Sequence, residues 1–307
     1  MSSTFGLYDP TAEHSACGVG FLTRKDGHPT HDVLVRGHEA LCAIPHRGGM
    51  SSEGVGDGAG VNIDLSVEFF SAVTGRQLTE RHFGVANFFL PEDRSHEQAA
   101  RDLVAAGLQA EGLEIVHVRE VPVDDSVLRP AAVGYQFPIT QWVFTAPGMT
   151  PEQADRAAND ALLGIEAEAY RTAEYTGLYP LSLSTRTQVL KGRLNADEVI
   201  PYFRDLVDPR HSVRTLYFHT RFSTNTEPHP TMAQPFRLMA HNGELNTDRK
   251  NRINDDAFAA ARHRTIVRPP GQSDSSRLDQ TLQSRVFDDG LGTVEAVVTL
   301  MPPGLGE

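Results

Sequence analysis

Apolar and polar residues alternate along much of the chain, and this period of two predicts half-buried β-strands. We expect strands at Val19–Thr23, Gly60–Leu65, Phe83–Leu90, Ile115–Val118, Thr140–Phe144, Leu181–Leu190, Arg214–Phe218 and Arg237–Ala240. The strands come in groups rather than in strict alternation with helices. That arrangement favours antiparallel sheets covered by helices, which makes the expected fold class α+β.

Two segments begin with helix start signals. In Ser95–Gln98 and Thr150–Gln153 a hydroxyl residue is followed three positions later by glutamine, which is the pattern of a capping box. After Thr150 the apolar positions recur at helical spacing and predict a long amphipathic helix, at Ala154, Ala158, Leu162, Ile165 and Ala169. We expect two more helices, around Val33–Ala43 and after Asp274, the latter with an apolar stripe at Leu278, Leu282 and Val286.

Composition then limits the class of protein. The chain has 307 residues, 39% of them hydrophobic and 22% charged, as is typical of a globular protein with a substantial core. A net charge of −12 argues against binding to nucleic acid. No apolar run approaches the ~18 residues that cross a bilayer, and Met1–Ala16 lacks the pattern of an export signal. Two cysteines are too few for a disulfide framework or a four-thiolate metal site. We expect a cytoplasmic protein without a metal site that binds neither nucleic acid nor membrane.

Cys17 is the candidate nucleophile. Sixteen residues precede it, and they show no apolar periodicity. If they were removed, Cys17 would carry both a thiol and a free α-amine, whose reference pKa of roughly 7.7–8.0 suits a general base. Such a residue predicts acyl transfer or amide hydrolysis. A single cysteine on a strand is also often a small core residue, so this stretch alone leaves both interpretations open. Cys42, on a predicted helix, is interpreted as a buried thiol.

Three later segments add polar groups, and each also has an ordinary structural explanation. Arg221, at the end of a strand, is suited to clamp a carboxylate, or it belongs to a surface turn. Asn242-Gly243 forms a turn, or it supplies two N–H donors to an oxyanion hole. Asp274 belongs to a helix N-cap, or it binds an ammonium group. Together with Cys17 these groups suit an amide that carries an α-carboxylate and an α-ammonium, and glutamine fits that description.

The sequence resembles the class II glutamine amidotransferase domain of glutamate synthases, which are N-terminal-nucleophile enzymes. The resemblance lies in collinear blocks over nearly the whole chain: Gly6–Pro10, Glu13–Phe21, Ala40–Cys42, His46–Gly49, Gly56–Gly60, Phe218–Thr226, Ala233–Pro235, His241–Thr247 and Ser273–Ser275. The blocks around Arg221 and Asn242 are shared with class II amidotransferases more widely. Gly6–Pro10 and the two glycine-rich blocks at 46–49 and 56–60 point to glutamate synthases.

The resemblance implies a four-layer αββα sandwich, a propeptide at residues 1–16 and an amidotransferase domain at residues 17–307. It implies that L-glutamine and water give L-glutamate and ammonia through a γ-glutamyl thioester. By matching positions, the implied roles are nucleophile for Cys17, oxyanion stabilisation for Asn242 and Gly243, α-carboxylate binding for Arg221, α-ammonium binding for Asp274, and pocket lining for Thr224 and Arg47.

Departures from the family leave alternatives open. Glutamate synthases continue for hundreds of residues, with an FMN-binding barrel and an iron–sulfur cluster, so we expect no cofactor in this chain. The amidotransferase domain of the family also continues past the last residue here, so the sandwich is expected to be shortened, open at a sheet edge or dependent on a partner. The chain is a glutaminase module for a synthase portion in cis or in trans, a stand-alone amidotransferase, or a non-catalytic domain in which Met1–Ala16 blocks Cys17.

Overall fold

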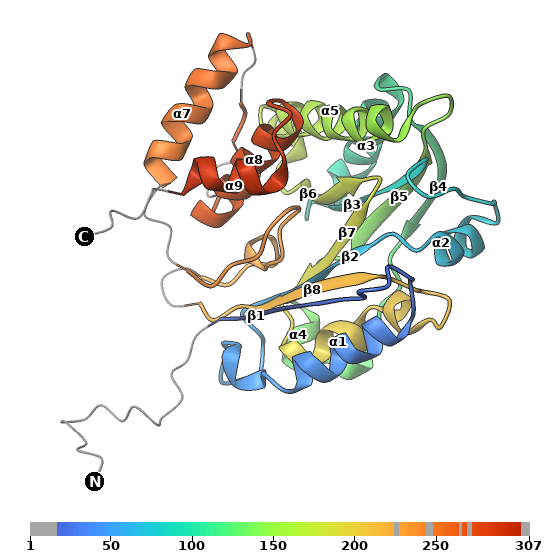
Figure 1. The fold of residues 1–307 in the computed structure, drawn as a ribbon. Helices are drawn as coiled ribbons and strands as arrows, with labels where there is room; N and C mark the ends of the chain where they lie inside the picture. Colours follow the sequence, from blue (N-terminus) through green and yellow to red (C-terminus); the bar gives the residue numbers. More distant parts are fainter. Residues whose placement is uncertain (1–16, 224–226, 244–247, 264–265, 269–271, 302–307) are drawn as a thin grey trace.

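The computed structural model describes residues 17–223, 227–243, 248–263, 266–268 and 272–301. Two antiparallel four-stranded sheets lie face to face between helices (Figure 1). The first sheet has the order β1-β8-β2-β7, with strands at Gly18–Thr23, Thr215–Thr220, Ala59–Asp64 and Thr187–Gly192. The second has the order β4-β5-β3-β6, with strands at Glu114–Glu120, Ile139–Thr145, Phe83–Phe89 and Tyr179–Ser184. The predicted α+β sandwich is confirmed.

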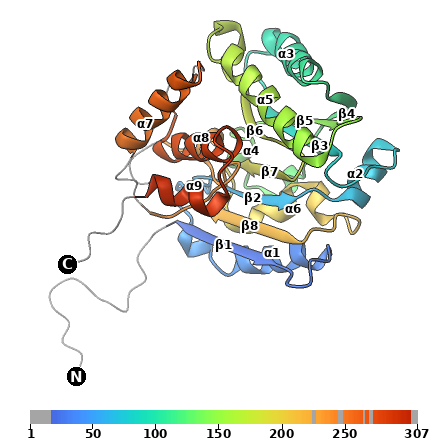
Figure 2. The same ribbon diagram turned by 45° about the horizontal axis from the view of Figure 1, so that its top comes forward.

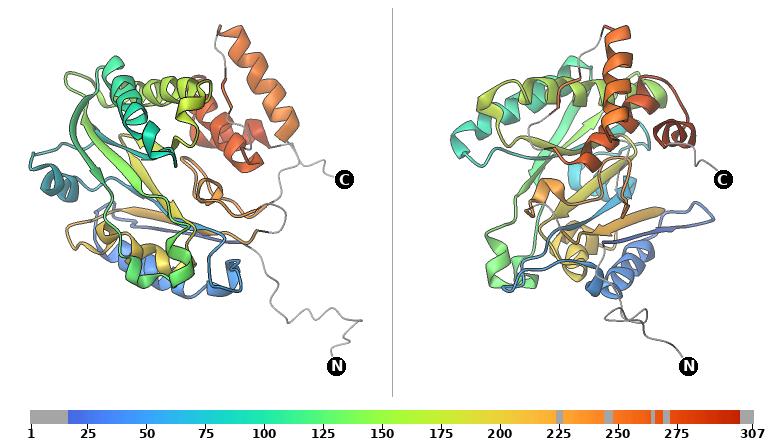
Figure 3. Two further views of the ribbon diagram at one scale, coloured as in Figure 1. Left: turned by 180° about the vertical axis from the view of Figure 1, so that it is seen from behind. Right: turned by 90° about the vertical axis from the view of Figure 1, so that its left-hand side faces the viewer.

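Helices cover the outer face of each sheet (Figures 1 and 3). The first sheet is covered by α1, α4 and α6, at Asp32–Cys42, Pro130–Val133 and Val199–Tyr202. The second is covered by α3 and α5, at Glu97–Ala110 and Pro151–Ala169, while α2 at Val67–Thr74 packs at its end. Helices α7, α8 and α9, at Asp248–Ala261, Asp274–Phe287 and Thr293–Leu300, form a group beside α5 (Figure 2). Short 3-10 turns lie at Pro45–Arg47, Arg94–His96, Asp125–Val127, Ala173–Tyr175, Ala196–Glu198, Arg204–Val207 and Pro230–Met232.

Helix α5 forms as its sequence predicts. The Thr150 hydroxyl accepts a hydrogen bond from the Gln153 N–H at 3.3 Å, and the Gln153 side chain accepts one from the Thr150 N–H at 2.8 Å. The apolar stripe is buried, at Ala154, Ala158, Leu162, Ile165 and Ala169. It packs with α3 against Phe88 and Trp142 of the second sheet. The predicted helices near Val33 and after Asp274 are confirmed as α1 and α8.

The layer between the two sheets contains a buried amide network. The Gln141 side chain donates to Asn87 at 2.9 Å and to Gln188 at 3.2 Å. Asn87 donates in turn to the Val189 carbonyl of the facing sheet at 3.1 Å. Buried amides are tolerated when they are hydrogen-bonded, and these bonds fix how the sheets face each other.

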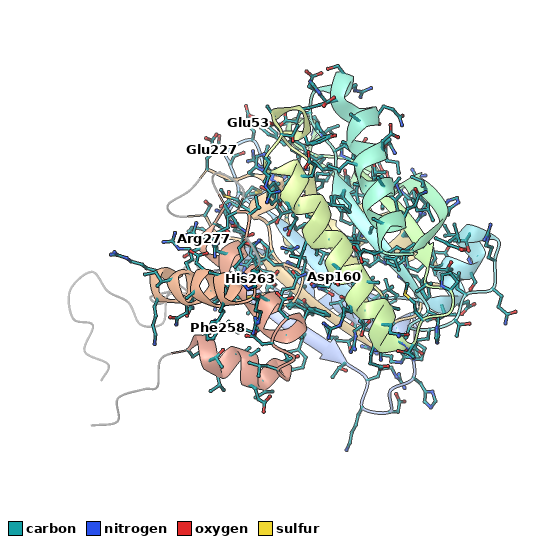
Figure 4. All side chains as sticks on the ribbon, turned by 90° about the horizontal axis from the view of Figure 1, so that it is seen from above. Glu53, Asp160, Glu227, Phe258, His263 and Arg277 are labelled. Atoms are coloured by element: carbon teal, nitrogen blue, oxygen red, sulfur yellow. The ribbon has the colours of Figure 1, made fainter. Side chains whose placement is uncertain are left out.

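The group of helices α7–α9 packs around its own small core. Leu278, Leu282, Ala296 and Leu300 are its buried members. Phe258 of α7, labelled in Figure 4, lies 4.3 Å from the Arg285 guanidinium of α8, measured to the ring centroid. Asp274 is the first residue of α8 and therefore lies on this group of helices.

The prediction of one strand over Leu181–Leu190 was wrong, because the segment forms β6 and β7 in different sheets. The chain changes sheet at Thr185-Arg186, whose side chains both donate to the Asp155 carboxylate of α5. Apolar alternation continues across this corner, so the pattern alone does not reveal it.

The prediction of a strand at Arg237–Ala240 was also wrong. The N–H groups of Arg237, Leu238 and Met239 donate to the Asp279 carboxylate of α8, at 3.2, 2.8 and 3.1 Å. A side chain therefore takes donors that a neighbouring strand would otherwise use.

Two smaller predictions were wrong. Ser95 does not begin a capping box, because its hydroxyl and N–H both donate to Asp93, and α3 begins at Glu97 without a side-chain cap. Cys42 is exposed rather than buried.

One expectation from the sequence was a sheet with an open edge. Among the described residues β1 is an edge strand, and Phe21 on it is 75% exposed. Within the same residues, no helix has the length and apolar character needed to span a membrane.

Candidate active site

Cys17 lies directly before β1, next to the turn that follows β8. Gly18 pairs with Thr220 in the sheet, so the register brings Cys17 beside Arg221 and Phe222. The Phe222 N–H donates to the Cys17 sulfur at 3.1 Å, and the thiol is half-buried. A β-carbon on Gly18 would lie only 2.8 Å from the Ile44 side chain, so a larger residue after Cys17 would displace its surroundings.

Arg221 is held by two neighbouring segments. Its N–H donates to the Gly58 carbonyl at 2.8 Å, and its own carbonyl accepts from the Gly49 N–H at 2.8 Å. Burial lowers the pKa of its guanidinium, while the charges of Asp57 and Cys17 oppose that shift. The guanidinium therefore lies within electrostatic range of both Asp57 and Cys17.

Asp57 fixes the turn on which Arg221 lies. Its carboxylate accepts a hydrogen bond from the Ser223 N–H at 2.7 Å. A β-carbon on Gly49 would lie 1.9 Å from the same carboxylate, so a larger residue there would displace Asp57. The Asp57 N–H also donates to the Gly49 carbonyl at 2.9 Å, so the glycine-rich blocks at 46–49 and 56–60 are joined beside the turn of Arg221.

Asn242 reaches Cys17 from a different part of the chain. Its side-chain amide donates to the Cys17 carbonyl at 2.6 Å. Asn242 and Gly243 are both exposed, so their polar groups are open to a ligand. A side-chain amide beside a thiol supplies the kind of donor that stabilises a tetrahedral oxyanion.

The residue before Asn242 is held on both sides. The His219 ring donates from Nε2 to the His241 carbonyl at 3.2 Å, and burial lowers the pKa of His219 to about 4. The Gln234 side chain accepts from the His241 N–H at 3.0 Å and donates to its carbonyl at 3.4 Å. A neutral His219 has one N–H and gives it to this carbonyl.

Asp274 is linked to the same loop through Ser275. It is the first residue of α8, after the Ser273 N-cap, and it is exposed. Its carboxylate accepts from the Ser275 N–H at 2.7 Å, and the Ser275 hydroxyl is hydrogen-bonded to the His241 ring at 2.6 Å. Asp274 therefore lies two hydrogen bonds from the residue that precedes Asn242.

The structure brings Cys17, Arg221 and Asn242 together and links Asp274 to them. Arg47 ends a 3-10 turn close to the start of β1, because its β-carbon lies 3.0 Å from where a β-carbon on Gly18 would be. Thr224 lies outside the described residues.

Five residues that support the site were given no role from the sequence: Asp57, His219, Gln234, His241 and Ser275. All five lie inside the sequence blocks that carry the resemblance to class II amidotransferases. Their place in those blocks was the only feature of the sequence that could have pointed to a role. Among the described residues no cluster of three or more His, Cys, Asp or Glu side chains is suited to a metal ion.

Comparison with known proteins agrees with this geometry. Residues 17–307 match the family described as glutamine amidotransferases class-II. The chain is 33% identical over 302 residues to the glutamate synthase [NADPH] large chain of Azospirillum brasilense, covering 92% of this chain and 20% of that protein. It is 31% identical over 323 residues to the glutamate synthase [NADH] of Saccharomyces cerevisiae, covering 97% of this chain and 15% of that protein. The glutamate synthase [NADPH] large chain of Bacillus subtilis is 33% identical over 257 residues, 82% of this chain and 17% of that protein. The chain thus spans a fifth or less of these relatives.

Proposed function

This chain belongs to the class II glutamine amidotransferases, and we propose that it hydrolyses L-glutamine to L-glutamate and ammonia for glutamate synthesis. The observation that carries the proposal is the bond from the Phe222 N–H, in the turn that also carries Arg221, to the Cys17 sulfur, together with the bond from the Asn242 amide to the Cys17 carbonyl. A nucleophile, a cation and an oxyanion donor drawn from three segments suit an amide substrate with a carboxylate at its other end.

In the proposed reaction the Cys17 sulfur attacks the side-chain carbonyl carbon of glutamine. The free α-amine of Cys17 takes the thiol proton and gives it to the departing nitrogen, so that ammonia leaves as the C–N bond breaks. The resulting γ-glutamyl thioester is attacked by water, whose proton goes to the same amine. That proton passes to the Cys17 sulfur as the C–S bond breaks and glutamate leaves. The Asn242 amide and the Gly243 N–H stabilise the oxyanion in both steps.

The two charged ends of glutamine meet opposite charges. We assign the α-carboxylate to Arg221, because a guanidinium can donate two parallel hydrogen bonds to one carboxylate. The α-ammonium is assigned to Asp274, which keeps one carboxylate oxygen for it because Ser275 bonds the other. Arg47 and Thr224 are proposed to line the pocket.

The amine that acts as base must first be released. We propose that residues 1–16 are a propeptide and that the bond between Ala16 and Cys17 is cut, because an acylated nitrogen is an amide and not a base. The start of the family match at Cys17 supports this boundary.

The names of the relatives favour glutamate synthase as the use of the ammonia. We propose that a synthase portion, in the same polypeptide or a separate one in the cytoplasm, consumes it. FMN and the iron–sulfur cluster are assigned to that portion, because two cysteines are too few to hold such a cluster.

The experiment that tests the function compares the two cysteines. Ammonia and glutamate release is measured for the purified chain, with intact mass to show whether residues 1–16 are gone. Cys17→Ser should abolish turnover, whereas Cys42→Ser, at an exposed position on α1, should keep it. Turnover by Cys17→Ser, or by a chain that retains residues 1–16, would contradict the proposed mechanism.

A further inference from the structure

The loop 230–243 carries Asn242 and Gly243 but contains no strand. A single 3-10 turn at Pro230–Met232 is its only regular element. Its main-chain groups must therefore find partners on other elements, since an unpaired buried N–H or carbonyl is costly. Two charged side chains, Lys191 and Asp279, supply many of those partners.

Lys191 of β7 holds the beginning of the loop. Its ammonium donates to the Ala233 carbonyl at 2.7 Å and to the Thr231 carbonyl at 3.2 Å. It also lies 4.7 Å from the centroid of the Phe236 ring, another residue of the loop. The side chain is 1% exposed, and burial lowers its pKa to about 7.

Asp279 of α8 holds the middle of the loop through its bonds to the N–H groups of residues 237–239. It is 1% exposed, and burial raises its pKa while Arg237 opposes the shift. Arg237 in turn donates to the buried Glu166 of α5 at 2.9 Å. The loop is thus tied to β7, α8 and α5 at once.

Lys191, Glu166 and Asp279 are buried and Arg237 is 13% exposed. The four charges balance, with two cations, Lys191 and Arg237, and two anions, Glu166 and Asp279. Apolar side chains of similar volume would usually stabilise a core as well or better, so buried charges are weak evidence for a role in stability. Here Lys191 and Asp279 form their hydrogen bonds with main-chain groups of the loop 230–243. Gln234, the residue after Ala233, bonds the main chain of His241, which precedes Asn242, and His219 of β8 bonds the same residue.

We propose that Lys191 and Asp279 are positioning residues for glutamine hydrolysis, which fix the loop 230–243 so that Asn242 meets the oxyanion. This inference rests on the proposed function. It requires that the two residues act on the transition state through Asn242, and not on glutamine binding or on the Cys17 nucleophile.

The test uses Asp279→Asn and Lys191→Met in a Cys42→Ser background, in which Cys17 is the only thiol. Each variant should lower kcat about 10–100-fold, because a displaced oxyanion donor loses much of its effect. KM for glutamine should change less than twofold, and the rate of Cys17 alkylation by iodoacetamide should stay the same. If Asp279→Asn does not fold, Lys191→Gln, which keeps one donor toward the carbonyls, serves in its place.

Two controls separate positioning from stability. Asp205→Asn disturbs another buried carboxylate, bound to Arg119 of β4, and should lower the melting temperature while keeping kcat. In an Asn242→Ala background, Asp279→Asn should cause little further loss of kcat, since it acts through the missing amide. An equal loss with and without Asn242, or a loss confined to KM, would overturn the inference. A wild-type chain that is processed before Cys17 yet does not hydrolyse glutamine would instead overturn the proposed function, and this inference with it.

Discussion

The Asn242 side-chain amide donates to the main-chain carbonyl of Cys17 at 2.6 Å, across 225 positions of sequence. The bond joins the loop 230–243 to the residue before the edge strand β1. It joins the Asn242 amide to the residue whose sulfur the proposed mechanism uses, and an amide nitrogen carries a second N–H that suits an oxyanion.

Removal of this amide tests its proposed role. Asn242→Ala should lower kcat for glutamine hydrolysis by about 10²–10³-fold, which is the usual loss for one oxyanion donor. Alkylation of Cys17 by iodoacetamide should proceed at the wild-type rate, because that reaction develops no oxyanion. Steady-state kinetics with unchanged kcat would remove Asn242 from the mechanism.

Substitution of Arg221 by lysine tests the assignment of the α-carboxylate. Arg221→Lys should raise KM for glutamine by about 10–100-fold, because lysine keeps the charge but not the bidentate geometry. Arg214→Lys is the matched control, since Arg214 lies just before β8 at its other end and pairs with Glu80. Similar KM values for the two variants would assign the carboxylate to another group.

Asp155 should stabilise the corner between the two sheets. Its carboxylate accepts from Arg81 at 2.8 Å as well as from Thr185 and Arg186. Asp155→Ala should lower the free energy of unfolding in urea by about 1.5–3 kcal/mol, the range for hydrogen bonds to a charged group. Glu152→Ala, an exposed partner of Arg81, should change it by less than about 0.5 kcal/mol. A loss at Asp155 as small as at Glu152 would contradict this role.

His211 should make stability depend on pH. It is fully buried against Phe69, with ring centroids 4.3 Å apart, and burial lowers its pKa to about 4. Because this folded-state pKa lies below the ordinary 6.5, the unfolded chain binds the proton first as pH falls. The contribution to stability is complete above pH 6.5 and is lost progressively toward pH 4, with a limiting slope of about 1.4 kcal/mol per pH unit.

Urea unfolding at several pH values measures this effect. The difference in unfolding free energy between wild type and His211→Gln should shrink from pH 7 to pH 5. The exposed His28 is the control, and His28→Gln should follow wild type in parallel. A constant difference for His211→Gln would show that His211 titrates alike in both states.

Local sequence determined those elements whose stabilising contacts are themselves local. Helix α5 is specified by its Thr150–Gln153 capping box and by an apolar stripe at helical spacing, and both lie within the helix. Strands whose sequences alternate apolar and polar residues, such as β2 and β8, were also predicted, although β2 is buried on both faces. The candidate residues Cys17, Arg221 and Asn242 could be named because they lie in distinctive blocks of sequence.

Tertiary structure decided what depends on distant partners. The segment 181–190 divides between two sheets because Asp155, on another helix, bonds Thr185 and Arg186 at the corner. The segment 237–240 is no strand because Asp279 takes its N–H groups. The charges that hold the loop of Asn242, Lys191 and Asp279, come from β7 and α8, so their effect exists only once the chain has folded. A period of two or 3.6 records which face of an element is buried, but not which distant side chain will pair with its backbone.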